Sequence, residues 1–275
     1  MNLTILVILY DCRLEDSKTL LSLFSCEKIN NYKICIVNNG PSVLGDNFLF
    51  NFPNVELRQD CLDNRSLSII YNEFISTYPS DYYVIFDHDT DISDSYFELL
   101  DDVLCKRLVK DVYLPIIYDN NIRYYPVTNG KVFSELAGEI GNARTIASGV
   151  IFSNEIVDKV SGCFGNVFDT RFYFYGVDST FFFRLNHLGV TYYVTSSLNH
   201  SLSRNEKNED SSYFRIKERS YDFGLTVRHY FSLMNLAKII YFIFTKPFKV
   251  GKYKSLKISY VLDALVTGKH YKNKG

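Results

Sequence analysis

Residues 82–89 read Tyr-Tyr-Val-Ile-Phe-Asp-His-Asp, an apolar run that ends in two carboxylates, Asp87 and Asp89. Five apolar and aromatic residues without a turn residue predict a buried strand, Tyr82–Phe86. Two aspartates two positions apart, directly after such a strand, can share one divalent cation, because Mg²⁺ and Mn²⁺ prefer oxygen ligands. The alternative is a solvated acidic turn that also includes Asp91 and Asp94. The position after a buried strand favours the metal site.

Strand and helix patterns alternate along the segments before this motif, and further strand and helix patterns follow it. Strand–helix alternation at this length predicts an α/β fold with a mainly parallel central sheet flanked by helices. Expected strands are Leu3–Tyr10, Tyr32–Val37, Asn54–Leu57, Ala147–Ile151 and Val190–Val194, and expected helices are Ser17–Phe24, Leu67–Ile75, Asn154–Val160 and Thr180–Leu188. The weakly patterned, Tyr-rich stretch Asp111–Asn142 is expected to be a loop region over the sheet.

Polar residues follow three of the expected strands. Tyr10 and Asp11 lie at the end of the strand Leu3–Tyr10, Asn38 follows Tyr32–Val37, and Asp87 and Asp89 follow Tyr82–Phe86. Ligands of open α/β sheets gather at the carboxyl ends of the strands. We therefore expect these residues to meet at one edge of the sheet and to form a binding site.

Composition excludes several classes of protein. The chain has 275 residues, of which 47% are apolar and 22% charged, so a packed core is expected. A net charge of −1 argues against nucleic acid as a partner. The six cysteines form no CxxC pair, which indicates reduced thiols in a cytoplasmic protein. The apolar start lacks a basic segment before it, so it indicates a first strand rather than a signal peptide.

The C-terminal part differs from the rest in charge. From Asn235 to Gly275 there are nine lysines, no arginine and one acid, Asp263. We expect one domain over residues 1–212 and a helical extension over residues 213–275. Apolar and aromatic residues interleaved with lysines, without a full membrane span, favour a helix that lies on an anionic membrane surface. The alternative is a helical pair packed on the body of the protein, its lysines merely solvated.

Several short motifs follow one another in a fixed order along residues 3–203. They are Tyr10-Asp11, Val37-Asn38-Asn39-Gly40-Pro41-Ser42, Asn64-Arg65-Ser66 through Asn72, Phe86-Asp87-His88-Asp89-Thr90, Ser148-Gly149, Phe168-Asp169, Tyr175-Gly176-Val177-Asp178-Ser179-Thr180 with Arg184 and Gly189, and His200-Ser201. In this order and spacing the chain resembles the family 2 glycosyltransferases of the GT-A fold, and among them the rhamnosyltransferase-like branch. That branch assembles O-antigen or capsular polysaccharide.

The resemblance implies a role for each matching position. Tyr10, Asp11, Asn38 and Asn64 would line the pocket for the nucleotide sugar, and Asp87 would contact it as well. Asp87 and Asp89 would hold Mn²⁺ or Mg²⁺ and the sugar diphosphate, and His200 would approach the metal or the diphosphate. Asp178 would be the general base that takes the proton of the acceptor hydroxyl, with inversion at the anomeric carbon. A positioned carboxylate contributes about 10²–10⁴ in rate to such a step.

Three positions depart from the family pattern or have another explanation. Asn38 stands where the family has an aspartate that reads the nucleotide base, so the base is left open. Val177 and Thr180 replace two acids around Asp178. Asp178 can also be explained as the N-cap of the following helix. His200 is explained equally well as a structural histidine at the end of a strand.

The resemblance thus implies an inverting, metal-dependent glycosyltransferase. Its acceptor would be a glycan linked to undecaprenyl diphosphate, at the inner face of the cytoplasmic membrane, with specificity set in residues 111–142. The alternative is a non-catalytic subunit of a polysaccharide assembly complex that binds a nucleotide sugar. A phosphatase of the haloacid dehalogenase type also uses Asp-x-Asp after a strand, but three strands precede the motif here. A glycosidase also uses two carboxylates, and nothing in the sequence favours hydrolysis.

Overall fold

The chain folds into two compact units. The structure, a computed structural model, describes residues 1–45, 49, 51–59, 63–106, 110–201, 209–248, 250–251 and 253–273. The first unit comprises residues 1–65, 70–167 and 181–205, and the second comprises residues 66–69, 168–180 and 206–275. Cys61, Lys249, Lys252 and Lys274, which belong to the cysteines and lysines counted above, lie outside the described residues. The predicted boundary at residue 213 stays a prediction.

A ten-stranded sheet forms the centre of the first unit. Its main path is β10-β13-β6-β12-β4-β1-β2-β3, with β5 paired to β13 and β7 paired to β6. A separate small sheet has the order β11-β8-β9. The strands are β1 Leu3–Leu9, β2 Lys33–Asn38, β3 Val55–Arg58, β4 Tyr82–Asp87, β5 Thr90–Ile92, β6 Val112–Asp119, β7 Ile122–Tyr125, β8 Val127–Thr128, β9 Lys131–Val132, β10 Gly138–Ile140, β11 Ala143–Arg144, β12 Val150–Ser153 and β13 Tyr192–His200.

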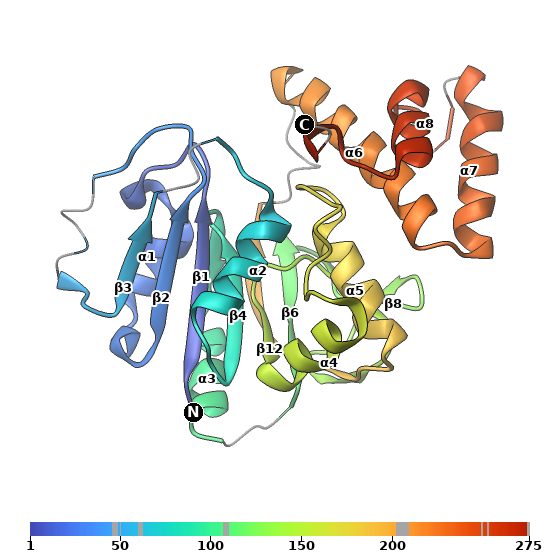
Figure 1. Ribbon diagram of the computed structural model, residues 1–275. Coiled ribbons are helices and arrows are strands. Elements are labelled where there is room, and N and C mark those ends of the chain that lie inside the picture. Colours follow the sequence, from blue (N-terminus) through green and yellow to red (C-terminus); the bar gives the residue numbers. More distant parts are fainter. Residues whose placement is uncertain are drawn as a thin grey trace. The chain divides into compact units, whose positions relative to one another are not determined.

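Strands β3, β2, β1 and β4 run parallel, as the sequence predicted, and they lie side by side in Figure 1. All seven residues of β1 are buried, because helices cover both faces of this part of the sheet. The register pairs Leu9 with Asn38 and Ile8 with Asp87. The carboxyl ends of β1, β2 and β4 therefore meet at one edge, as expected.

The other half of the sheet corrects the prediction for residues 111–142. Strand β6 lies between β13 and β12 in the sheet, and seven of its eight residues are buried. Pro115 made this segment unlike an expected central strand. Strand β12 runs antiparallel to both β4 and β6, whereas β13 runs parallel to β6. The α/β class is confirmed, with a sheet that is parallel on one side and mixed on the other.

Helices pack on both faces of this sheet. Their bounds are α1 Lys18–Ser25, α2 Leu67–Thr77, α3 Asp94–Leu104, α4 Asn154–Phe164 and α5 Val177–His187. Ser17 caps α1 as predicted, since its hydroxyl accepts the Leu20 N–H. Helix α3 was not predicted, although Tyr96, Leu99, Leu100 and Val103 repeat at helical spacing and are buried.

The second unit consists mainly of three helices, α6 Glu209–His229, α7 Leu233–Thr245 and α8 Ile258–Thr267 (orange to red in Figure 1). Helices α6 and α8 cross closely at Gly224, where a Cβ atom would lie 2.6 Å from the Val261 carbonyl oxygen. The small core of this unit contains Val227, Ile239, Phe242, Leu256 and Val261. Within the described residues, every helix is too short or too polar to cross a lipid bilayer.

Candidate functional site

Three side chains gather at the edge of the sheet where β4 and β13 end. They are Asp87, the last residue of β4, Asp89, two residues later, and His200, the last residue of β13. His200 Nδ1 lies 3.4 Å from Asp89 Oδ1, and His200 Nε2 lies 4.0 Å from Asp87 Oδ2. One ligand atom from each residue lies within 4.8 Å of the other two. The structure thus brings together the three residues named as metal ligands from the sequence.

The pairing of β5 with β13 places His200 in this cluster. These strands are antiparallel and match His200 with Thr90, the residue that follows Asp89. The predicted strand ended at Val194, but β13 continues to His200 after a register shift between Val194 and Ser197. The contact therefore joins residues more than 100 positions apart. We refer to Asp87, Asp89 and His200 as the acidic cluster.

Buried hydroxyl groups hold the acidic cluster in place. The Thr90 hydroxyl lies 2.8 Å from His200 Nδ1 and 2.7 Å from the Ser148 hydroxyl, which accepts the Asp87 N–H at 3.2 Å. On the other side, the Thr19 hydroxyl donates to the Asp87 carbonyl at 2.5 Å and accepts the Thr90 N–H at 3.1 Å. Thr90, Ser148 and Thr19 are all buried. Because Nδ1 of His200 is hydrogen-bonded to Thr90, Nε2 is the ring nitrogen on the side of Asp87.

The donor set fits a divalent cation. Two carboxylates and one imidazole suit Mn²⁺ and, less specifically, Mg²⁺, and metal-binding histidines usually hydrogen-bond through their second nitrogen, as His200 does to Thr90. Desolvation raises the pKa of the Asp87 carboxyl, and the negative charge of Asp89 raises it further, while His200 lowers it. The desolvation is partial, because 40% of the Asp87 side-chain surface is exposed. A positive charge between two neighbouring carboxylates favours their ionised forms.

A polar pocket of about 320 Å³ adjoins the acidic cluster. Lys18 contributes to it, and the turn from β6 to β7 supplies four consecutive residues, Tyr118–Asn121. Asn120 and Asn121 adopt left-handed backbone conformations, and the Asn120 amide donates to the Asp119 carboxylate. The complete lining is Lys18, Asp89, Asp91, Tyr118, Asp119, Asn120, Asn121, Asn199, His200 and Ser201. We call this cavity the β6–β7 pocket.

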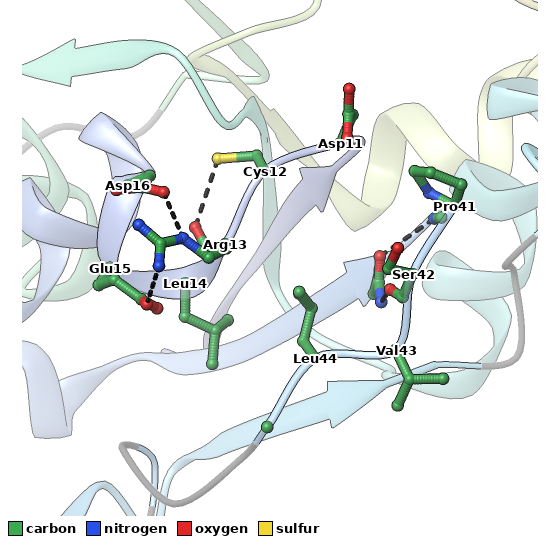
Figure 2. A pocket seen from close by; sticks show the side chains of 13 residues that line it. Asp11, Cys12, Arg13, Leu14, Glu15, Asp16, Pro41, Ser42, Val43 and Leu44 are labelled. Carbon is green, nitrogen blue, oxygen red and sulfur yellow. Dashed lines mark hydrogen bonds and ion pairs between the residues drawn. The ribbon is translucent and has the colours of Figure 1, made fainter.

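A larger pocket of about 650 Å³ opens beyond the ends of β1 and β2, as Figure 2 shows. Its walls are two loops, one that follows β1 and one that follows β2. The lining is Asp11, Cys12, Arg13, Leu14, Glu15, Asp16, Asn38, Gly40, Pro41, Ser42, Val43, Leu44 and Gly45. Of the residues assigned to nucleotide-sugar binding, Asp11 and Asn38 line this β1–β2 pocket, whereas Tyr10, Asn64 and Asp87 are not among its lining residues.

Hydrogen bonds from asparagines shape the loops around the β1–β2 pocket. Asn38 Nδ2 donates to the Ser42 carbonyl at 2.7 Å and to Gln59 Oε1 at 3.1 Å, and Asn38 Oδ1 accepts the Gly40 N–H. The side chain of Asn38 therefore closes the turn after β2. Asn39 is buried and donates a hydrogen bond to the Asn64 side chain. No separate role was predicted for it. Tyr10 is 43% exposed at the end of β1.

Asp178 lies in the first turn of α5. The helix begins at Val177, and the Gly176 carbonyl accepts hydrogen bonds from both the N–H and the hydroxyl of Thr180. Asp178 is therefore already inside the helix, and the N-cap explanation proposed for it was wrong. A carboxylate in the first turn is stabilised by the partial positive charge of the helix N-terminus. Gly176 has a positive φ, and a Cβ atom there would overlap the Asp222 carboxylate and Phe172.

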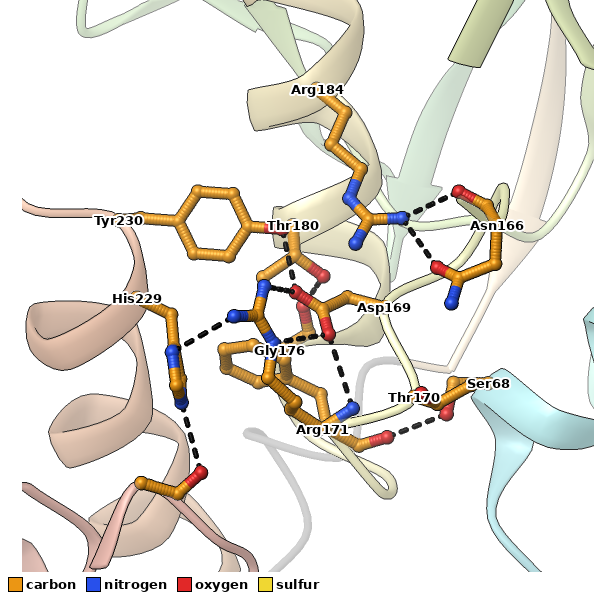
Figure 3. Close-up of polar contacts among 12 residues, drawn as sticks. Ser68, Asn166, Asp169, Thr170, Arg171, Gly176, Thr180, Arg184, His229 and Tyr230 are labelled. Atoms are coloured by element: carbon orange, nitrogen blue, oxygen red, sulfur yellow. Dashed lines mark hydrogen bonds and ion pairs between the residues drawn. The ribbon is translucent and has the colours of Figure 1, made fainter. Parts of the chain in front are cut away.

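Two other residues of the matching motifs have structural roles. Asp169 accepts hydrogen bonds from Arg171 and from the Tyr230 hydroxyl, and Arg171 also contacts His229 (Figure 3). Burial alone would raise the pKa of the Asp169 carboxyl, but these hydrogen bonds outweigh it and hold the pKa below its ordinary value. Arg184 is buried and donates to the carbonyl oxygens of Asn166 and Val167. Both residues stabilise loops.

Comparison with known proteins gives structural matches. No protein-family model and no curated protein sequence matches the chain. The solved structure of S. aureus TarS matches with a TM-score of 0.56 and 14% identity over 96% of this chain and 50% of that one. TarS residues 1–349 in complex with UDP-GlcNAc match with a TM-score of 0.56 and 15% identity over 98% of this chain and 80% of that one. The same TarS segment has also been solved with UDP.

These matches establish the fold. Nearly the whole chain superposes on TarS, and the mixed sheet with flanking helices is the GT-A fold that the family resemblance implied. This chain spans about half the length of full-length TarS. Because the identity is below 25%, the matches speak to the fold alone, and the rhamnosyltransferase-like branch stays a prediction.

Proposed function

We propose that this protein is a metal-dependent glycosyltransferase that uses a nucleotide-diphosphate sugar as donor. The observation that carries the proposal is the placement of the acidic cluster and the β1–β2 pocket at the same sheet edge. A protein of the same fold has been solved with UDP-GlcNAc, which makes UDP-sugars the first donors to test.

The proposed chemistry assigns separate roles to three sets of residues. The β1–β2 pocket, with Asp11 and Asn38, would take the nucleoside. Asp87, Asp89 and His200 would hold Mn²⁺ or Mg²⁺, which when bound offsets negative charge on the diphosphate. Asp178 would accept the proton of the acceptor hydroxyl as its oxygen attacks the anomeric carbon. The sugar–diphosphate bond breaks on the opposite side, so the nucleoside diphosphate leaves with the bonding electrons and the anomeric configuration inverts.

The β6–β7 pocket supports the proposal that residues 111–142 determine the acceptor. Its amides and carboxylates, from Asp119 to Asn121, can hydrogen-bond to sugar hydroxyls, and it lies beside Asp89 and His200. We propose a glycan as acceptor, carried on undecaprenyl diphosphate at the inner face of the cytoplasmic membrane. Assembly of a surface polysaccharide, whether O-antigen or capsule, would be the process it serves.

The test is release of nucleoside diphosphate from a panel of UDP-, GDP- and dTDP-sugars in Mn²⁺ or Mg²⁺. Donor hydrolysis needs no acceptor, so it reports on the donor site alone. We expect release from one donor, and loss of that release in EDTA. Asp178→Asn is expected to lower transfer to an acceptor about 10²–10⁴-fold while donor binding is kept. Glu155→Gln is the matched control, because Glu155 is an exposed acid in the first turn of α4.

Three results would contradict the proposal. Failure of every donor to bind in calorimetry would exclude the nucleotide-sugar site. Donor binding without any turnover, even with acceptor glycans supplied, would favour the non-catalytic binding subunit, for which the loss of two acids around Asp178 is the supporting observation. Release of inorganic phosphate from monoesters would instead indicate a phosphatase.

A further inference from the structure

Helix α7 exposes an unusual amount of apolar surface. Of its thirteen residues, only Asn235, Ile239 and Phe242 are buried. Most of the others are large and apolar, and their exposed fractions reach 81% at Leu233 and 71% at Phe244. A helix that is apolar on all sides is normally covered on all sides. Most of the surface of α7 is therefore uncovered, although its composition is that of a buried helix.

The exposed residues form one continuous face. At 100° per residue, the three buried residues fall on one side of α7, where they pack in the core of the second unit. The opposite half of the helix carries no charge, and Phe248 and Val250, which follow the helix end, are exposed as well. We define the α7 face by the exposed residues Leu233, Met234, Leu236, Ile240, Tyr241, Ile243, Phe244, Phe248 and Val250.

The sequence that contains and follows this face is positively charged. Between Asp222 and Asp263 the sequence contains no acid, and five lysines lie between Phe244 and Ile258. Among them, Lys254 and Lys257 are described and exposed. Lys238 is half-buried at the flank of the helix, where it donates to Asn235. Such a combination matches a surface that is apolar inside and anionic at its boundary, which is the chemistry of an anionic lipid bilayer.

We propose that the α7 face is a membrane-binding surface, with α7 lying in the plane of an anionic bilayer. A helix of thirteen residues is about 20 Å long, shorter than the roughly 30 Å hydrocarbon core, so it can lie in the interface but not span it. The phenylalanines and isoleucines enter the acyl region while the lysines contact the lipid headgroups. This inference needs no nucleotide sugar and stands apart from the proposed transfer reaction.

The test is flotation of the full chain with two kinds of vesicle. One contains neutral phosphatidylcholine alone, and the other contains about one-third phosphatidylglycerol. We expect strong binding to the anionic vesicles and weak binding to the neutral ones. The double variant Ile240→Ser/Phe244→Ser should lower partitioning into the vesicles on the order of 100-fold, because it lacks two apolar side chains whose transfer from water into the bilayer favours binding. Lys254→Gln should lower it about fivefold.

Matched variants separate this role from general effects. Leu136→Ser makes the same kind of change at a residue of the first unit that is 76% exposed, and it should leave vesicle binding unchanged. Circular dichroism of each variant checks that the fold is kept. Failure of the wild-type chain to float with anionic vesicles would overturn the proposal. A concentration-dependent dimer that the Ile240→Ser/Phe244→Ser variant abolishes, without flotation, would show that a second copy covers the α7 face instead.

Discussion

The first unit buries most of its apolar side chains and gathers charge at one sheet edge, whereas helix α7 of the second unit exposes most of its apolar side chains. In the first unit, Asp87, Asp89 and His200 come from distant segments and are fixed by buried hydroxyls of Thr90, Ser148 and Thr19. In α7, the exposed side chains belong to consecutive turns of one helix, and Tyr241 among them also packs against the ring of Tyr253.

This difference separates two kinds of function. Chemistry requires several groups held at defined distances, so it depends on tertiary hydrogen bonds such as those around the acidic cluster. Adsorption to a surface requires area and charge but no fixed geometry. A single small substitution in the acidic cluster should therefore have a large effect on its function. Binding through the α7 face should instead depend on the summed effect of several substitutions.

The largest expected effect is that of Asp89→Ala. Because it removes one of the two carboxylates, we expect Mn²⁺ binding to be lost in calorimetry and donor turnover to fall about 10³-fold or more, equivalent to about 4 kcal/mol. Asp94→Asn is the control, since Asp94 is exposed in the first turn of α3 and lies outside the cluster. Equal Mn²⁺ affinity in the Asp89→Ala variant and the wild type would show that the cluster is only an acidic turn.

The next prediction compares two phenylalanines on opposite sides of α7. Phe242 is 2% exposed and Phe244 is 71% exposed. Phe242→Ala should lower the free energy of unfolding by about 3–5 kcal/mol, because it leaves a cavity in the small core of the second unit. Phe244→Ala should change it by less than about 0.5 kcal/mol. Similar losses for both variants in urea unfolding would mean that protein covers the α7 face.

A smaller effect is expected for the hydroxyl that bridges Ser148 and His200. Thr90→Val keeps the branched shape of the side chain but removes its hydrogen bonds, so the imidazole is no longer held. Loss of such a supporting partner typically lowers metal affinity 10–100-fold. Calorimetric titration with Mn²⁺ measures this, and Thr4→Val in β1 serves as the matched buried substitution. Unchanged affinity in Thr90→Val would show that His200 is not a ligand.

The smallest expected effect concerns Asp222 in the second unit. Desolvation and the nearby Glu218 raise the pKa of this carboxyl to about 6, above its value in an unfolded chain, although its hydrogen bond with Thr226 lowers it. The folded state then binds more protons between about pH 4 and pH 6, so the contribution of Asp222 to stability falls as the pH rises through that window.

Replacement of Asp222 by asparagine should remove this penalty. Because Asp222 is partly exposed, we expect a gain of about 1 kcal/mol at pH 7 and none at pH 4. Thermal unfolding at the two pH values measures the difference, with Asp94→Asn as the control. A gain of the same size at both pH values would refute the proposed ionisation of Asp222.

Local patterns predicted the parallel half of the fold well. The apolar runs of β1, β2 and β4 and the Ser17 cap of α1 are visible in the sequence, because each depends on neighbouring residues. Strand β6 was missed because Pro115 is rare in a central strand. The order of the strands placed Asp87 and Asp89 at the correct edge of the sheet.

The geometry of the acidic cluster was beyond the reach of the sequence. His200 could be named as a candidate, but its distance to Asp89 depends on the pairing of β5 with β13. The supporting hydroxyl of Thr19 carries no sequence signal, since a threonine in the first turn of a helix is common. The end of β13 could have been found from the alternation of Tyr192, Val194, Leu198 and His200, which are buried, with more exposed neighbours.

The most direct test of the central claim is a calorimetric titration of UDP-GlcNAc into the full chain, once with Mn²⁺ and once with EDTA. If the acidic cluster holds the metal and the β1–β2 pocket takes the nucleotide, binding should be clear with Mn²⁺ and at least tenfold weaker with EDTA. GDP- and dTDP-sugars are titrated in parallel, in case the site prefers another base. Equal affinity with Mn²⁺ and EDTA, or no binding of any donor, would contradict the account.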